Sequence, residues 1–204
     1  VNNDTLATWL LPVLAPILID EQLLVEFILD NQGHTFSLLE GGHAVACISG
    51  EPEPMRGCSA SLLGVMRYRL VASPAFAQRW FPAGITRATA QVAPLMVFDR
   101  KDAMQSSFLL TQFGLPDGAY PFHYVPSSDA FAEAVRLGLG YGMLPHEQCA
   151  ALLQSGDLVD LSPAIAHDVP LYWHAWRIQP PRLERMGAAL LKAARAALLP
   201  LEQP

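Results

Sequence analysis

Residues 125–145, VPSSDAFAEAVRLGLGYGMLP, decide the fold class of this chain. The polar cluster at 127–129 has the residue types that cap helix N-termini, so we predict a helix over 130–137. Gly138 ends that helix, and the apolar run 141–144 predicts a short strand that is closed by a proline. The stretch is therefore a helix, a glycine turn and a strand, which is the repeating unit of an α/β fold.

The same alternation of strand and helix extends along the chain in both directions from this unit. Apolar, β-branched runs bounded by turn residues predict strands at 23–29, 44–48, 62–72, 95–98, 119–125, 141–144, 158–161 and 169–177. Apolar residues at helical spacing predict helices at 6–18, 35–40, 74–78, 87–91, 102–113, 130–137, 146–153 and 181–199. A turn is expected at 30–33. The series runs twice, which indicates two small α/β domains with mostly parallel sheets.

Two of the predicted strands, 62–72 and 169–177, are unusually long and bracket the second series. We therefore expect the chain to cross from the first domain to the second and back along them. The first domain is then discontinuous, with residues 1–72 and 173–204, and the second domain is residues 73–172. Ligands of open α/β sheets bind beyond the carboxyl ends of the strands, close to helix N-termini.

The composition is typical of a folded chain and excludes several classes of protein. Of the 204 residues, 51% are hydrophobic and 16% charged, enough to bury one large core or two small ones. The formal charge of −6 argues against DNA or RNA binding by this chain alone. The apolar stretch 6–19 contains Pro12 and Pro16 and is too short to span a bilayer. Three cysteines, an odd count, and the lack of a visible secretory signal predict a cytoplasmic protein.

Motifs of catalysis and metal binding are not found. Six histidines occur without a G-x-S-x-G nucleophile turn, and Cys58 has no paired signature. The patterns C-x-x-C, H-E-x-x-H and Walker A are also missing. The glycines between 138 and 142 resemble a nucleotide loop, but they follow a helix and enter a strand, the reverse of the order such a loop needs. We predict no catalytic residue, no metal and no cofactor, and a protein that is not an enzyme.

Three aspartates lie where a ligand could reach them. Asp4 and Asp129 fall in the first turns of predicted helices, and Asp99 comes just after a predicted strand. Each can serve simply as a helix cap. Helix N-termini also bind anions, so N–H groups near Thr5 and Ser128 together with these carboxylates would suit a zwitterion with an extra positive charge. A basic amino acid fits that description.

The order of residues resembles the regulatory half of a LysR-type transcriptional regulator. Residues 125–145 match the helix, glycine turn, strand and proline of that family, and residues 156–161 match its following short strand. Residues 1–12, 97–99 and 171–174 resemble the ArgP/LysG subgroup more narrowly. That subgroup senses lysine and arginine and controls genes of basic amino acid export or metabolism.

The resemblance implies a fold like that of type II periplasmic binding proteins. Two Rossmann-like subdomains would be joined by two crossover strands, with the effector in the cleft between them. Family members carry a winged helix-turn-helix and a linker helix ahead of this domain, and neither lies in these 204 residues. We therefore expect the chain to begin inside a larger protein, with DNA binding in the absent part.

The resemblance also implies a homodimer of this domain and a tetramer of the full-length protein. The first helix is apolar nearly all round and would leave Leu6, Leu10, Val13 or Ile17 exposed in a monomer. The effector site that the resemblance implies draws on helix N-termini and strand ends, with two aromatic walls. Its predicted residues are Asn3, Asp4, Thr5, Trp9, Ser49, Phe98, Asp99, Ser127, Ser128 and Asp129.

Two other functions are compatible with these residues. One is a periplasmic amino acid-binding protein of the same fold, and the other is a small α/β enzyme, which would need a nucleophile or acid/base pair in the cleft. The role of the Pro-rich, charged loop at 51–58 stays open, as do the identity of the effector and the direction of control.

Overall fold

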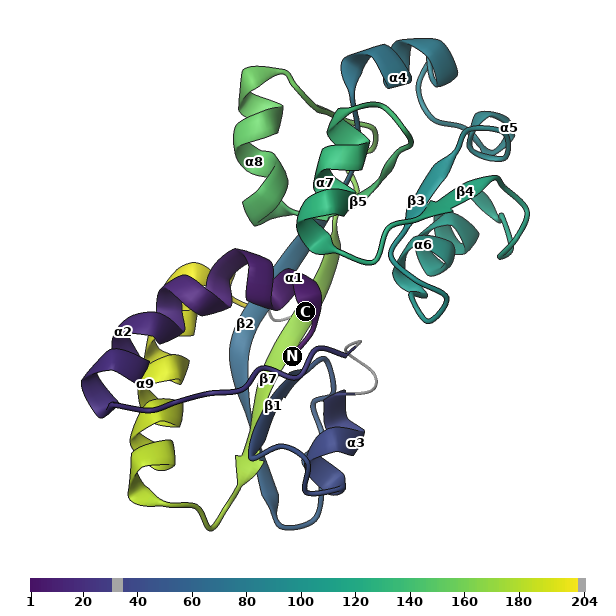
Figure 1. Ribbon diagram of the computed structural model, residues 1–204. Helices are drawn as coiled ribbons and strands as arrows, with labels where there is room; N and C mark the ends of the chain where they lie inside the picture. Colours follow the sequence, from purple (N-terminus) through teal and green to yellow (C-terminus); the bar gives the residue numbers. More distant parts are fainter. Residues whose placement is uncertain (31–34, 202–204) are drawn as a thin grey trace. The chain divides into compact units, whose positions relative to one another are not determined.

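Figure 1 shows the computed structural model, which describes residues 1–30 and 35–201. The chain has the mixed α/β fold that the sequence predicts, and it divides into two compact units. Unit 1 consists of Val1–Met66 and Asp168–Pro204, and unit 2 consists of Arg67–His167. The boundaries between the two units fall within strand β2 (Cys58–Ala72) and after the first residue of strand β7 (His167–Trp176). The chain therefore passes between the units along these two strands.

Unit 1 contains three neighbouring strands covered by helices. Strand β1 (Ala46–Ser49) pairs antiparallel with β7, and β7 lies next to β2. Helix α2 (Leu11–Glu21) packs beside α9 (Pro181–Ala197) on one face of these strands, and α3 (Thr35–Glu40) covers the other (Figure 1). Under α3, Leu39 packs with Cys47 and Cys58 in a small buried cluster.

The first helix is built in three pieces. The Asn2 side chain caps it by accepting a hydrogen bond from the Thr5 N–H at 3.0 Å. The short helix α1 (Asn3–Thr5) continues as a π-helical turn (Leu6–Leu10, labelled η1 here) and then as α2. Pro12 has no N–H to donate and crowds the carbonyl four residues back, that of Thr8 in the π-helical turn, which accounts for the widening of this turn.

The exposed side of this helix differs from the prediction. Leu10 is buried, so its expected exposure is wrong, while Leu6, Val13 and Ile17 are half-buried. Leu11 and Ile19 are exposed instead. The widened turn rotates the helix face by a fraction of a turn, which a regular helical period cannot anticipate.

Unit 2 has a parallel pair of strands and a larger set of helices. Strand β3 (Leu95–Val97) runs parallel to β4 (Phe122–Tyr124), and β5 (Gly142–Pro145) and β6 (Val159–Asp160) pair antiparallel with β2. A buried cluster that includes Val71, Met96, Phe131 and Leu144 forms its core. The helices of this unit are α4 (Pro74–Trp80), α5 (Arg87–Ala90), α6 (Met104–Phe113), α7 (Ser128–Arg136) and α8 (His146–Ser155).

The glycine-rich turn between α7 and β5 acts as predicted, as a helix stop with tight packing. Gly138 has φ +80°, a conformation that L side chains rarely adopt. A Cβ on Gly140 would lie 2.8 Å from the Pro94 carbonyl oxygen, so only glycine fits there without a shift of backbone. The turn therefore serves packing rather than phosphate binding.

Two predictions about the strands are wrong. Residues 23–29 are extended but do not form a strand. Val1 forms hydrogen bonds with Ile28 and Asp30 at the end of this segment. The sheets are not mostly parallel, because β1–β7, β2–β5 and β2–β6 are antiparallel. Buried strands are apolar runs in either direction, so composition does not reveal the direction. The turn expected at 30–33 lies outside the described residues except for its first position.

His174 of β7 gives unit 1 a testable dependence on pH. This side chain is fully buried opposite Cys47, and its Nε2 lies 2.9 Å from the Glu51 carbonyl oxygen. Burial, the largest effect, lowers the pKa of His174 from 6.5 although the Glu51 carbonyl raises it. As pH falls, the His174 ring therefore takes up its proton in the unfolded chain before it does so in the folded chain. The contribution of neutral His174 to stability is present above pH 6.5 and is lost below it.

We expect the free energy of unfolding from urea titration to decrease between about pH 7 and about pH 5.5. His174→Gln should flatten this slope, because it removes the titrating ring. The variant His123→Asn, at an exposed position of β4, is the matched control and should keep the slope. An unchanged slope in His174→Gln would assign the pH dependence to other groups.

Candidate functional site

Five of the predicted site residues come together at one edge of the sheet in unit 2. Strands β3 and β4 are parallel, with Val97 opposite Tyr124, and the Val125 N–H donates to the Val97 carbonyl oxygen at 3.0 Å. The residues that follow the carboxyl ends of two paired parallel strands lie at the same edge of the sheet. These residues are Phe98, Asp99, Ser127, Ser128 and Asp129.

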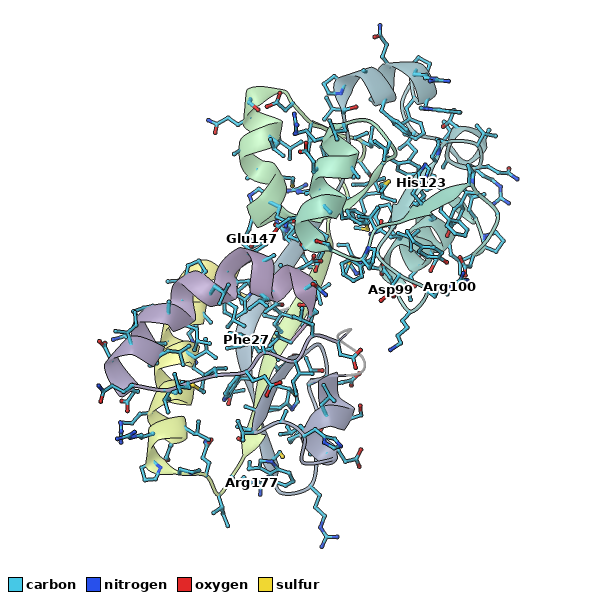
Figure 2. All side chains as sticks on the ribbon, in the orientation of Figure 1. Phe27, Asp99, Arg100, His123, Glu147 and Arg177 are labelled. Carbon is cyan, nitrogen blue, oxygen red and sulfur yellow. The ribbon has the colours of Figure 1, made fainter. Side chains whose placement is uncertain are left out.

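Asp99 closes the loop after β3. Its Oδ1 accepts hydrogen bonds from the N–H groups of Lys101 at 2.7 Å and Asp102 at 3.0 Å, the pattern of an Asx turn. Figure 2 shows Asp99 beside Arg100 in this loop. One carboxylate oxygen thus holds the loop in shape, and Phe98 packs against the core cluster of unit 2.

Asp102 is a neighbouring carboxylate that the sequence analysis did not single out. Its Oδ2 accepts from the Phe98 N–H at 3.2 Å, and its Oδ1 accepts from the Met104 N–H at 2.9 Å. Burial raises the pKa of Asp102, against the lowering effect of these two N–H groups. Its position two residues before α6 is the available sequence signal, since acidic residues favour helix starts.

The start of α7 offers hydroxyl groups in two different settings. Ser127 is the N-cap residue and is exposed, and its side chain makes no capping hydrogen bond. Ser128 is buried, and its Oγ accepts from Gln148 Nε2 of α8 at 2.9 Å. Asp129 is exposed in the first turn of α7. Gln148 was missed by the sequence analysis, because nothing in the sequence pairs it with a serine twenty positions away.

The first helix of unit 1 carries four more predicted residues, and two of them are unusual. Thr5 is fully buried, and Trp9 is 4% exposed one turn further along the helix. Thr5 Oγ1 and Trp9 Nε1 are buried and have no hydrogen-bond partner within residues 1–30 and 35–201. Leaving a buried hydroxyl or N–H group without a partner costs about 1–3 kcal/mol of stability, so these two groups call for an explanation.

The remaining predicted residues of unit 1 are placed more simply. Asn3 and Asp4 are half-buried in α1, and the Asp4 carbonyl oxygen accepts from Thr8 Oγ1 at 2.6 Å. Ser49 ends β1, is fully buried, and its Oγ accepts from the Glu51 N–H at 3.1 Å. Ser49 thus fixes the start of the loop at 51–58.

These groups are hydroxyls, carboxylates, N–H groups and aromatic rings, the chemistry of a site for a small polar ligand. The described ranges 1–30 and 35–201 hold no group of three or more His, Cys, Asp or Glu that could bind a metal ion. In the same ranges no helix has both the length and the hydropathy needed to cross a membrane. The chain thus has a mixed α/β fold, and each of its two units carries polar groups of this kind.

Comparison with known proteins identifies the family. The family described as LysR substrate binding domain matches residues 3–195. The regulator ArgP of Aeromonas salmonicida is 40% identical over 98% of this chain and 67% of its own length. The chain belongs to the LysR family of transcriptional regulators, in which it corresponds to the substrate-binding domain, and this family is not a family of enzymes.

Solved structures agree with this assignment. The C-terminal domains of a LysR family protein from Agrobacterium tumefaciens match with a TM-score of 0.92 and 37% identity over 98% of this chain and 96% of that one. The full-length regulator LysG from Corynebacterium glutamicum with bound effector Arg matches with a TM-score of 0.88 and 33% identity over 98% of this chain and 68% of that one. The chain spans about two thirds of the length of the full-length regulators that it matches.

Proposed function

We propose that this chain senses a basic amino acid, arginine or lysine, for a LysR-type regulator of amino acid export or metabolism genes. The observation that carries the proposal is the likeness, over 98% of the chain, to a regulator structure with bound effector Arg. The 40% identity to an ArgP regulator supports the same subgroup. DNA binding belongs to a part of the regulator outside these 204 residues, and the regulator acts in the cytoplasm.

The residues that the resemblance implies would match such a ligand by charge. Hydroxyls and N–H groups at the start of α7 would bind the α-carboxylate, since a helix N-terminus favours anions. The carboxylates of Asp4, Asp99 and Asp129 would bind the α-ammonium group and the side-chain cation. Trp9 and Phe98 would pack on the aliphatic stem or on a guanidinium plane.

We further propose that the two units correspond to the two Rossmann-like subdomains of a periplasmic-binding-protein-like fold. Strands β2 and β7 would be the crossovers, with subdomain bounds near those predicted, 1–72 with 173–204 and 73–172. The cleft that the resemblance implies stays a prediction. An effector that prefers one arrangement of the subdomains would shift the population of that arrangement and so change DNA binding.

The proposal includes a homodimer of this domain and a tetramer of the full regulator. Leu11 and Ile19 expose 45% and 74% of their surface on the first helix, and Leu24 beyond it is fully exposed. Exposed apolar side chains would be covered by a partner in such a dimer.

The alternative, a periplasmic amino acid-binding protein, is disfavoured by the family assignment. The relatives of this chain named above are regulators, and its three cysteines are all free and buried, as in proteins of reducing compartments.

A thermal-shift experiment tests the proposed effector class. At a free concentration of 100 times Kd, a ligand that binds only the folded chain adds about 2.7 kcal/mol of stability. For a domain of this size we expect arginine or lysine to raise Tm by about 5–10 °C, and leucine, the uncharged control, to leave it unchanged. Equal shifts with leucine and arginine would contradict a site for basic amino acids.

Asp99→Asn tests the charge of the site without removing the turn. Asparagine keeps the oxygen that accepts from the Lys101 and Asp102 N–H groups, so we expect folding to be preserved. Loss of the carboxylate should weaken arginine binding about tenfold or more in calorimetry. Asp20→Asn, which removes the same charge from an exposed position on α2, should leave the affinity unchanged. Equal affinities of the wild type and Asp99→Asn would remove Asp99 from the site.

A further inference from the structure

Strands β3 and β5 of unit 2 are joined by one step of a parallel ladder. The N–H of Tyr141, the residue before β5, donates to the Pro94 carbonyl oxygen at 3.2 Å. The Met96 N–H donates to the Tyr141 carbonyl oxygen at 2.8 Å. A Cβ on Gly142 would lie 3.2 Å from Met96 Cβ, so the two strands are in close contact here. Strand β3 therefore has a parallel neighbour on each side, β4 and β5.

The ladder between β3 and β5 is replaced at its next step. Hydrogen bonds along one edge of a parallel pair recur every two residues. The next bonds would join the Met143 N–H to the Met96 carbonyl oxygen and the Phe98 N–H to the Met143 carbonyl oxygen. Instead, the Met143 N–H donates to Gln105 Oε1 of α6 at 3.0 Å. The Phe98 N–H donates to Asp102 Oδ2 at 3.2 Å. Two side chains thus take the place of the ladder.

Gln105 is an unusual residue for its position on α6. Its side chain is buried, and it lies on the face of the helix that also carries the buried residues Phe108 and Leu109. Burying an amide side chain costs free energy unless the amide is hydrogen-bonded. A continued ladder would satisfy the Met143 N–H without any buried side-chain amide. The sheet alone therefore does not require Gln105, so its role lies in what it anchors.

The loop between β3 and α6 is closed by its own hydrogen bonds. Asp99 Oδ1 accepts from the N–H groups of the second and third residues after it. The Asp102 carboxylate accepts from the N–H groups at the two ends of the loop, Phe98 and Met104. These bonds make the loop a single piece, and Gln105, the next residue, ties it to β5. A change at this anchor would move the loop as a whole and Asp99 with it.

We propose that Gln105 is a positioning residue of the effector site, because its bond to the Met143 N–H fixes the place of the loop and of Asp99 at the edge of the sheet. The inference rests on the proposed function, in which the Asp99 carboxylate binds a cationic group of the effector. Residues that bind a ligand are held in a precise geometry by buried hydrogen bonds behind them. Gln105 contacts the backbone of β5 and acts through Asp99.

Gln105→Met tests the anchor. Methionine is nearly as long as glutamine, favours helices and packs in apolar surroundings, but it offers the Met143 N–H no oxygen. We expect arginine binding to weaken about tenfold in calorimetry, because Asp99 is no longer held in place. Amide hydrogens of residues 98–104 should exchange about tenfold faster by NMR, since the loop opens more often.

Tyr141→Phe is the matched control for this variant. It also removes a buried hydrogen bond, from Tyr141 Oη to the Ala90 carbonyl oxygen at 3.4 Å, but at the other end of the same pair of strands. It should lower the stability and change neither the arginine affinity nor the exchange at 98–104. If it weakens arginine binding as much as Gln105→Met does, the effect is a general loss of stability and the proposal is wrong.

A double variant separates a positioning role from a merely structural one. If Gln105 acts through Asp99, Gln105→Met should weaken arginine binding by less than about twofold once Asp99→Asn has removed the carboxylate. Losses that simply add in the double variant would overturn the proposal. An unchanged arginine affinity in Gln105→Met, when the wild type binds arginine, would overturn it as well.

The exchange measurement needs no effector and so keeps the two proposals apart. If the wild type binds neither arginine nor lysine, the proposed function fails. Faster exchange in Gln105→Met then still supports Gln105 as the anchor of the loop, and unchanged exchange overturns it. If Gln105→Met does not fold, Gln105→Asn replaces it with the same expected results, because asparagine keeps the amide but is one methylene shorter.

Discussion

Thr5→Val should weaken arginine binding about tenfold to a hundredfold and leave the effector-free domain as stable as before. Thr5 Oγ1 is buried and has no hydrogen-bond partner in the described parts of the chain. Replacing an unsatisfied buried hydroxyl with a methyl group of the same shape is neutral or stabilising, whereas a lost hydrogen bond to a charged ligand costs roughly 1.5–3 kcal/mol. Calorimetric titration measures the affinity, and urea unfolding without effector measures the stability.

Ser73→Ala is the matched control for this prediction. Ser73 is a buried hydroxyl of similar size whose Oγ accepts from the Phe76 N–H at the start of α4. Its removal should cost about 1 kcal/mol of stability through loss of a helix cap and leave arginine binding unchanged. If Thr5→Val instead lowers the stability and keeps the affinity, the hydroxyl is a structural group and does not bind the effector.

Gly64→Ala should lower the free energy of unfolding by about 3 kcal/mol. Gly64 lies in β2 with φ +152°, outside the usual range of L residues, which adds backbone strain of about 1–3 kcal/mol. A Cβ there would lie 2.5 Å from Leu198 Cβ and 3.0 Å from the Leu199 carbonyl oxygen, so the overpacking adds about 1–3 kcal/mol more. The residue after Gly64, Val65, is bridged to Leu199, which prevents the end of the chain from moving away easily.

Gly84→Ala separates the two causes in the same measurement. Gly84 has φ +89°, and nothing lies within 4 Å of an added Cβ, so only the backbone strain remains. We expect a loss of about 1 kcal/mol in urea unfolding. Equal losses in the two variants would show that the contact between β2 and residues 198–199 is not tight.

Local signals explain which parts of the fold were predictable. The polar cluster at 127–129, Gly138 and Pro145 are chemical stops, so α7 and β5 begin and end within two residues of their predicted bounds. Residues 23–29 have the composition of a strand and yet are assigned none, because a strand needs a partner that its own residues do not encode. Strand direction is likewise a property of the pair, which is why sheets that were expected to be mostly parallel contain the antiparallel pairs β1–β7 and β2–β5.

In the candidate site, too, local signals were predictable and contacts that form on folding were not. The sequence places Asp99 after a strand and Ser128 at a helix start, and the parallel pairing of β3 with β4 brings them to one edge. Asp102 and Gln148 escaped notice because their roles depend on partners, the Phe98 N–H and Ser128 Oγ, that only the folded chain brings near. The two unpartnered groups of the first helix could not be predicted, since hydrogen bonding is visible only after folding.

The measurement that tests the central claim most directly is a calorimetric titration of the domain with arginine and with citrulline. Citrulline has the shape of arginine and an uncharged ureido group in place of the guanidinium, so the pair isolates the cation that the carboxylates would recognise. We predict that arginine binds and that citrulline binds at least about tenfold more weakly. Equal affinity for both, or binding of neither arginine nor lysine, would contradict the proposal that this domain senses a basic amino acid.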